Sequence, residues 1–177
     1  MAARPAEPTG PTGATGFTGS TASTGSTGST DPADRPAPGR AERRRLPLAT
    51  APGAVARSRE FTRSALRAWG WLPGADDRTR TAAEDVLLMT SELVTNACQH
   101  AAGPYVLELT RYGPLLRVEV RDADDRPPTL RLRREPARPG GHGLLVVDRL
   151  SAAWGSEPVE GGGKTVWLEI VRPPAEP

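Results

Sequence analysis

Three polar side chains with the spacing of one helix face are the first candidates for chemistry. Glu92, Asn96 and His100 follow one another at intervals of four residues. On an α-helix they form a single stripe that drifts by only ~40° per step. An asparagine oxygen and a carboxylate one turn apart are donors that hydrated Mg²⁺ accepts, and such a carboxylate can also orient or deprotonate a hydroxyl group. A polar stripe that merely faces solvent is the alternative interpretation.

Further candidates lie at strand ends and before a short helix. Asp122 closes an apolar strand, where a carboxylate can accept a hydrogen bond from an exocyclic amine. The glycine-rich segment 140–143 directly precedes a helical pattern, and glycines there let backbone N–H groups approach a phosphate. A second glycine-rich segment, 161–165, leads into the last strand. An acidic turn, a glycine turn without a ligand and an ordinary hairpin loop are equally good local interpretations of these three features.

Apolar periodicity predicts two helices that would position the polar stripe. The first covers residues 54–69 and is stopped by Gly70. The second runs from about residue 77 to 101, with Asp76 or Asp77 as its N-terminal cap. The residues of this longer helix that are expected to face the core are Ala82, Val86, Met89, Leu93 and Ala97.

Alternating apolar residues predict strands on either side of these candidates. A short edge strand is expected at Leu46–Leu48, and two hairpins are expected over residues 105–121 and 152–171. A short helix from about Leu144 to Leu150 separates the hairpins. This order predicts an α/β fold, a two-layer sandwich with helices on one face of a mixed, mainly antiparallel sheet.

Composition divides the 177 residues into a tail and one domain. The chain has 19 glycines and 19 prolines, which together make up about a fifth of it. Residues 1–45 hold Gly/Ser/Thr-rich triplets followed by a Pro-rich stretch. We expect residues 1–45 to be a disordered tail and linker, with Arg43–Arg45 as its solvated end. Residues 46–172 would form one domain, large enough for a real core, and 173–177 a C-terminal tail.

Charge and cysteine usage restrict the partners and the compartment. Residues 46–177 carry equal numbers of acidic and basic side chains, which gives no case for direct nucleic-acid binding. No apolar run is long enough to span a membrane or to form a signal peptide. A single cysteine, Cys98, cannot form an intramolecular disulfide, so the cytoplasm is the expected location.

The order of the individually weak motifs is more specific than any one of them. It reads Glu-x-x-x-Asn on a helix, Asp after a strand, Gly-x-Gly before a helix, and Gly-Lys-Thr into the last strand. Over about residues 46–171 the chain resembles the nucleotide-binding domain of the GHKL superfamily, which DNA gyrase and histidine kinases share. It is most similar to the small bacterial members, many of them actinobacterial, that act as anti-sigma factors and serine/threonine-protein kinases in partner switching. The matching segments are Ser91–Ala97 (N box), Val120–Asp122 (G1 box), Gly140–Leu144 (G2 box) and Gly162–Val166 (G3 region).

The resemblance implies a Bergerat-type ATP-binding fold with ATP and Mg²⁺ as cofactors. It assigns Mg²⁺ to Asn96, activation of a water or hydroxyl to Glu92, and the adenine amine to Asp122. It also implies that Thr165 supports the adenine from the last strand.

The family pattern also includes two glycines in the G2 box, which this chain has, and two in the G1 box, which it lacks. Gly141 and Gly143 would let the lid backbone reach the phosphates. The family's G1 box is Asp-x-Gly-x-Gly, whereas this chain has Asp124 and Arg126 at the two glycine positions.

Two classes of function follow from the resemblance. The first is an ATP-dependent serine/threonine-protein kinase and anti-sigma factor that phosphorylates an anti-sigma factor antagonist and regulates transcription by partner switching. The antagonist, a sigma factor or both would be its partners, and the resemblance also allows a homodimer. The alternative is a non-catalytic binding module that senses nucleotide and sequesters a regulatory partner.

Overall fold

The computed structural model of the protein describes residues 41–48, 53–100, 105–129 and 143–174. These residues all belong to one unit of the chain, Pro36–Pro177. The expected tail over residues 1–40 and the glycines of the G2 box before Gly143, including Gly141, lie outside the described residues.

Strands and helices alternate along the described chain much as the periodicity predicts. Their order and bounds are β1 (Glu42–Leu48), α1 (Ala54–Ala68), α2 (Asp77–His100), β2 (Tyr105–Tyr112), β3 (Leu115–Asp122), α3 (Gly143–Leu150), β4 (Ala153–Pro158) and β5 (Lys164–Val171). Of the two residues expected to cap α2, it is Asp76 that does so, because its Oδ1 accepts a hydrogen bond of 2.7 Å from the backbone N–H of Thr79.

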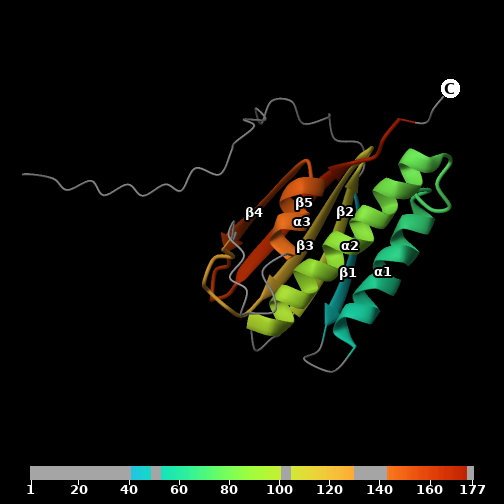
Figure 1. The fold of residues 1–177 in the computed structure, drawn as a ribbon. Coiled ribbons are helices and arrows are strands. Elements are labelled where there is room, and N and C mark those ends of the chain that lie inside the picture. The colour runs from blue at the N-terminus through green and yellow to red at the C-terminus, as the bar shows by residue number, and fades with distance from the viewer. Residues whose placement is uncertain (1–40, 49–52, 101–104, 130–142, 175–177) are drawn as a thin grey trace, which may run out of the picture. The chain divides into compact units, whose positions relative to one another are not determined.

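The five strands form one sheet in the order β1-β2-β3-β5-β4. Each pair of neighbouring strands is antiparallel, so the expected mixed sheet is antiparallel throughout the described strands. The three helices lie together on one face of the sheet (Figure 1). The predicted fold class, helices layered on one face of a sheet, is confirmed.

The core lies between the helices and the sheet. Every residue that the sequence predicts for the core face of α2 is buried, and the buried side chains of β3 alternate with exposed or half-buried ones. In β5 the buried positions are Lys164, Val166, Leu168 and Ile170. Because successive side chains of a strand point to opposite faces, Lys164 occupies the end of the row that these apolar residues form.

The first strand begins at Glu42, four residues before the start that the sequence predicts. Arg43 and Arg44, expected in a solvated linker, belong to this strand and have partners in the domain. The Arg43 guanidinium forms an ion pair of 3.1 Å with Glu108 on β2, and that of Arg44 lies 5.6 Å from the ring centroid of Trp69. These contacts and the pairing with β2 keep the arginine run in the strand.

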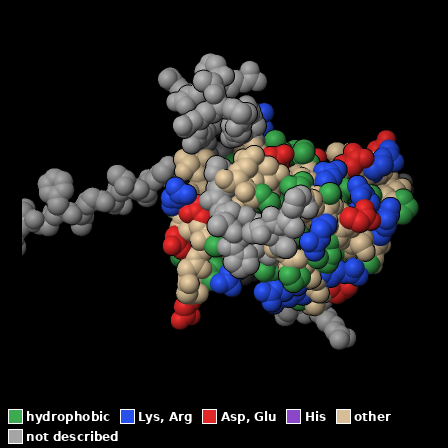
Figure 2. Space-filling model, turned by 90° about the horizontal axis from the view of Figure 1, so that it is seen from below, with side chains coloured by type: hydrophobic (Ala, Val, Ile, Leu, Met, Phe, Trp, Pro, Cys, Tyr) green, Lys and Arg blue, Asp and Glu red, His purple; other side chains and the backbone are tan. Residues whose placement is uncertain are grey.

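Charged side chains of both signs lie next to one another over the described elements on the side of the domain shown in Figure 2. This distribution agrees with the balanced charge of residues 46–177. Among the described residues, no helix is both long and apolar enough to cross a membrane.

Candidate functional site

Asp122 is the last residue of β3 and lies on the helix-covered face of the sheet. It follows Leu116, Val118 and Val120 in the alternation of buried positions, and only 4% of its surface is exposed. Its partner in the register of the sheet is Lys164, the first residue of β5. The edge of the core is therefore formed by two charged side chains of opposite sign.

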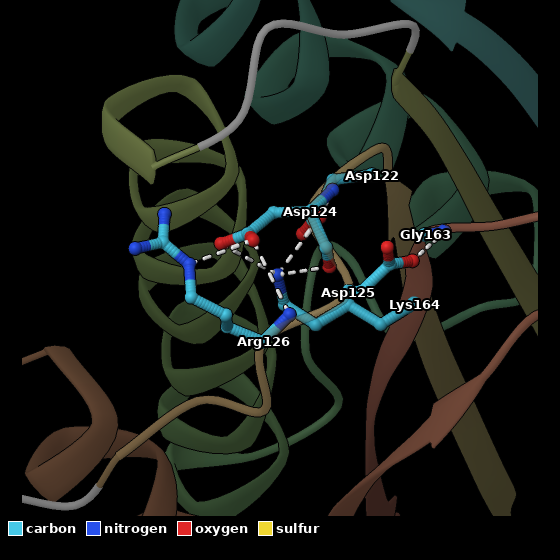
Figure 3. A network of polar contacts seen from close by, with 6 residues as sticks. All are labelled: Asp122, Asp124, Asp125, Arg126, Gly163 and Lys164. Atoms are coloured by element: carbon cyan, nitrogen blue, oxygen red, sulfur yellow. Dashed lines mark hydrogen bonds and ion pairs between the residues drawn. The ribbon is translucent and has the colours of Figure 1, made fainter. Parts of the chain in front are cut away.

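Lys164 and Asp122 form a buried ion pair. The Lys164 Nζ donates hydrogen bonds to Asp122 Oδ1 at 2.9 Å and to the backbone oxygen of Asp124 at 2.8 Å. It also lies 3.5 Å from the Asp124 Oδ2 atom. Figure 3 shows the ammonium group among these oxygen atoms, two of which accept its hydrogen bonds while the third belongs to an ion pair.

The loop after Asp122 is held by its own side chains. Asp122 Oδ1 accepts a hydrogen bond of 2.9 Å from the backbone N–H of Asp124. Asp124 Oδ1 in turn accepts hydrogen bonds from the backbone N–H and the guanidinium of Arg126, at 3.2 and 3.0 Å. The hydrogen bonds from Arg126, helped by the charges of Lys164 and Arg126, lower the pKa of the Asp124 carboxyl to about 2. Asp124 therefore remains ionised at neutral pH and keeps both partners.

The same loop is joined to β5 at Gly163. The Asp125 carboxylate accepts a hydrogen bond from the backbone N–H of Gly163, as Figure 3 shows. Gly163 has a φ of +84°, and a Cβ atom at this position would collide with the backbone oxygen of Asp122. Glycine is needed here because the two segments approach too closely for a side chain.

On the helical side, Glu92 lies against the first residue of α3. A Cβ atom on Gly143 would collide with Glu92 Oε2, and would lie 3.3 Å from the Glu92 Cβ atom. Gly143 thus makes room for the carboxylate of Glu92. Asn96, one turn further along α2, is half-buried, as is Glu92.

Of the predicted site residues, Asp122 lies on the helix-covered face of the sheet, Glu92 lies against Gly143, and Asn96 is half-buried one turn along α2 from Glu92. Thr165 does not share the sheet face of Asp122. It neighbours Lys164 on β5, so its side chain points to the opposite face of the sheet. The support of the adenine by Thr165 from the last strand stays a prediction.

The sequence motifs include Lys164 but do not single it out as a site residue. It is the only lysine of the chain, which otherwise uses arginine. It stands inside the G3 region, and the strict alternation of β5 places it on the same face as the apolar core. That alternation was the available indication, but the pairing with Asp122 follows only from the register of β3 and β5.

Within the described part of the chain, no group of three or more His, Cys, Asp and Glu side chains could hold a metal ion. A protein-made cage for Mg²⁺ is therefore not built from these residues. The Asn96 oxygen remains as a single oxygen donor of the predicted type, which suits an ion held mainly by water and phosphate oxygens.

Comparison with known proteins agrees with this architecture. The family model of the histidine kinase-like ATPase domain matches residues 48–170. No match was found among curated proteins.

Among solved structures, the chain is similar to "The crystal structure of the RsbU and RsbW domains of Rv1364c from Mycobacterium tuberculosis". The identity is 20% and the TM-score 0.54, and the match covers 76% of this chain and 34% of that one. This likeness concerns the fold, and the chain spans about a third of the length of the solved chain. Because the family match extends over more than half of the residues and over the elements that carry Glu92, Asn96 and Asp122, the chain belongs to the histidine kinase-like ATPase domain family.

Proposed function

We propose that this protein binds ATP and acts as a serine/threonine-protein kinase and anti-sigma factor that phosphorylates an anti-sigma factor antagonist. The observation that carries the proposal is the state of Asp122. This carboxylate is nearly fully buried. Within the described residues, its Oδ1 atom accepts the hydrogen bonds from the Lys164 ammonium and from the backbone N–H of Asp124. Its Oδ2 atom makes no such hydrogen bond within the described residues, and it is this atom that we assign to a donor of the ligand.

An exocyclic amine is the donor that this carboxylate fits. A buried ionised carboxylate only accepts hydrogen bonds, and a hydrogen bond to a charged group in a low-dielectric site is strong. We assign Asp122 Oδ2 to the amine of adenine. Guanine and hypoxanthine carry a carbonyl at that place and would leave Oδ2 unpaired.

The helical side of the site supplies the groups for phosphoryl transfer. Bound ATP would supply the transferable phosphoryl group, and bound Mg²⁺ would supply the positive charge that neutralises the phosphates. Asn96 would offer an amide oxygen to the metal, and the backbone N–H groups at the start of α3 would receive the phosphates. Glu92, which lies against Gly143 at that point, would orient the hydroxyl of a serine or threonine.

Transfer and binding can be measured separately on the full chain. ATP with a radiolabelled γ-phosphate should label an anti-sigma factor antagonist on serine or threonine, and calorimetry should show Mg²⁺-dependent binding of ATP. Binding with no transfer to any antagonist tested would contradict the kinase assignment. Absence of binding would contradict the nucleotide site itself.

A second function is favoured by the loop after Asp122. Asp124 and Arg126 stand where the family has glycine, and the loop is tied by Lys164 and by an ion pair of 3.0 Å between Arg126 and Asp124. A loop fixed in this way suits a module that senses nucleotide and sequesters a regulatory partner without turnover. ATP-dependent capture of the antagonist or sigma factor, without phosphorylation, would support this alternative.

A further inference from the structure

We propose that Lys164 is the positioning residue of the adenine-reading carboxylate. Its ammonium holds Asp122 Oδ1 and so presents Oδ2 as the acceptor that selects adenine. The inference rests on the proposed nucleotide site and adds to it the residue that sets the selectivity for the base.

The contacts of Lys164 show that it acts through Asp122. Its Nζ atom donates hydrogen bonds to Asp122 Oδ1 and to the Asp124 backbone oxygen, at 2.9 and 2.8 Å, and lies 3.5 Å from Asp124 Oδ2. All three neighbours are oxygen atoms of Asp122 and of the loop that follows it. The ammonium therefore does not read the ligand itself but determines how the carboxylate beside it is turned.

The chemistry of lysine suits this task. An ammonium is a compact charge with three donors on a flexible stem, whereas a guanidinium is a planar fork. Lysine and arginine together account for 23 residues of the chain, and only one of these is a lysine. This lysine stands at a buried position, where its side chain is 8% exposed. Three rotatable donors on one nitrogen suit the two hydrogen bonds and the ion pair that converge on Lys164 better than the fixed planar fork of a guanidinium.

Lys164 also helps to hold the loop that follows Asp122. The loop from Asp122 to Arg126 has side chains at the two positions where the family has glycine. In this chain Lys164 ties the loop to β5 through the Asp124 oxygen, and Asp125 ties it to Gly163. The loop is therefore held against β5 by two hydrogen bonds between a charged side chain and the backbone.

A different role for the same pair predicts the opposite outcome. If the ammonium blocked the carboxylate, nucleotide would have to displace it, and removal of the charge would improve the binding of ATP. If Lys164 positions the carboxylate, its removal leaves Asp122 Oδ1 with only the hydrogen bond from the Asp124 backbone N–H, so the carboxylate is held less firmly and the preference for the exocyclic amine falls. The sign of the change distinguishes the two.

The test compares ATP with inosine triphosphate, which has a carbonyl in place of the amine, on the full-length protein with Mg²⁺. The wild type should bind ATP about tenfold or more tightly than inosine triphosphate, the scale of one buried hydrogen bond. Lys164→Met should weaken ATP until the two affinities are nearly equal and leave inosine triphosphate unchanged. Lys164→Arg restores the charge and should recover part of the preference.

The matched control is Arg121→Met. It removes one positive charge from the residue directly before Asp122, but from an exposed side chain on the opposite face of the sheet. The ratio of the two affinities should stay at the wild-type value. An equal loss of both nucleotides in Lys164→Met would show a merely structural role and would overturn the inference, as would an unchanged ratio or a gain in ATP affinity.

A spectroscopic readout keeps the test decisive even if Lys164→Met fails to fold. Because the chain has one lysine, selective isotope labelling gives a single side-chain ammonium signal in nuclear magnetic resonance. The signal should persist and shift on binding of ATP, since the ion pair remains in the complex. Loss of the signal through exchange with water on ATP binding would show displacement of the ammonium and would overturn the inference.

Failure of this inference and failure of the proposed function give different results. If the wild type binds neither nucleotide, the proposed nucleotide site is wrong and the role of Lys164 falls with it. If the wild type prefers ATP and the ratio does not depend on Lys164, only the positioning role is wrong.

Discussion

At the scale of single residues, Glu92 and Asn96 occupy one half-buried stripe of α2, but their proposed roles differ and should fail differently. If Glu92 orients the attacking hydroxyl, Glu92→Gln keeps the shape of the site and most of the ATP affinity. Phosphoryl transfer should fall by roughly 10² or more, the scale of the loss of a general base. Steady-state transfer assays beside calorimetry would measure both quantities.

Asn96→Ala is the complementary change. Removal of the amide oxygen leaves the triphosphate charge less well compensated, so Mg²⁺-dependent binding of ATP should be lost while the thermal unfolding curve is kept. Unchanged affinity with Mg²⁺ in calorimetry would remove Asn96 from the metal site.

Asp124 offers a pH-dependent test of the loop network. Its pKa is lowered from the usual 3.8 to about 2, chiefly by the hydrogen bond from the Arg126 side chain. A carboxyl with a lowered pKa in the folded state contributes stability above its unfolded pKa, and this contribution is lost as the pH falls towards 2. Carbon chemical shifts should titrate with a midpoint near 2 in the wild type, and Arg126→Gln should raise the midpoint towards 3.8. An unchanged midpoint in Arg126→Gln would mean that the contact between Arg126 and Asp124 does not persist in solution.

At the scale of elements, the start of α3 is fitted to α2 at one point. Gly143 is buried at the first position of α3, and a Cβ atom there would collide with Glu92 Oε2. Gly143→Ala should therefore destabilise the domain by about 1 kcal/mol, because the glutamate must move although alanine favours the helix.

A double-mutant cycle isolates this contact. In the Glu92→Ala background the same Gly143→Ala change should be neutral or stabilising, since only the gain in helix propensity of ~1 kcal/mol remains. Urea unfolding would give the four free energies. Equal effects of Gly143→Ala in both backgrounds would show that the glycine has no special relation to Glu92.

At the scale of the whole molecule, the end of the tail and the start of the domain can be located by truncation. Residues 1–40 hold only two large apolar side chains, Met1 and Phe17, so their deletion should change neither the melting temperature nor the affinity for nucleotide. Deletion of residues 1–45 removes the first half of β1, including the Arg43–Glu108 ion pair and the Arg44–Trp69 contact.

This longer deletion should lower the melting temperature by several degrees, because each 1 kcal/mol shifts a domain of this size by roughly 2–8 °C. Differential scanning calorimetry of the two truncated chains beside the full chain provides the comparison. A loss of several degrees on deletion of residues 1–40 would contradict the assignment of that segment to a tail.

The secondary structure could be predicted from the sequence because its causes are local. Helical spacing of apolar residues fixed the extent and the buried face of α2, and the alternation in residues 105–121 fixed the first hairpin, with bounds close to those observed. The start of β1 could not be predicted in this way. An arginine run appears solvated until its partners Glu108 and Trp69, far along the chain, are known.

The candidate site divides in the same manner. The sequence by itself determined which residue types stand at which spacing: Glu92 and Asn96 one helical turn apart, Asp122 at a strand end, and a glycine before α3. Only the tertiary structure decided which of them meet. The register of β3 against β5 pairs Asp122 with Lys164 and turns Thr165 to the other face, and the packing of α3 on α2 sets Gly143 against Glu92. Register and helix packing are set by contacts between residues far apart in the chain, which no local pattern contains.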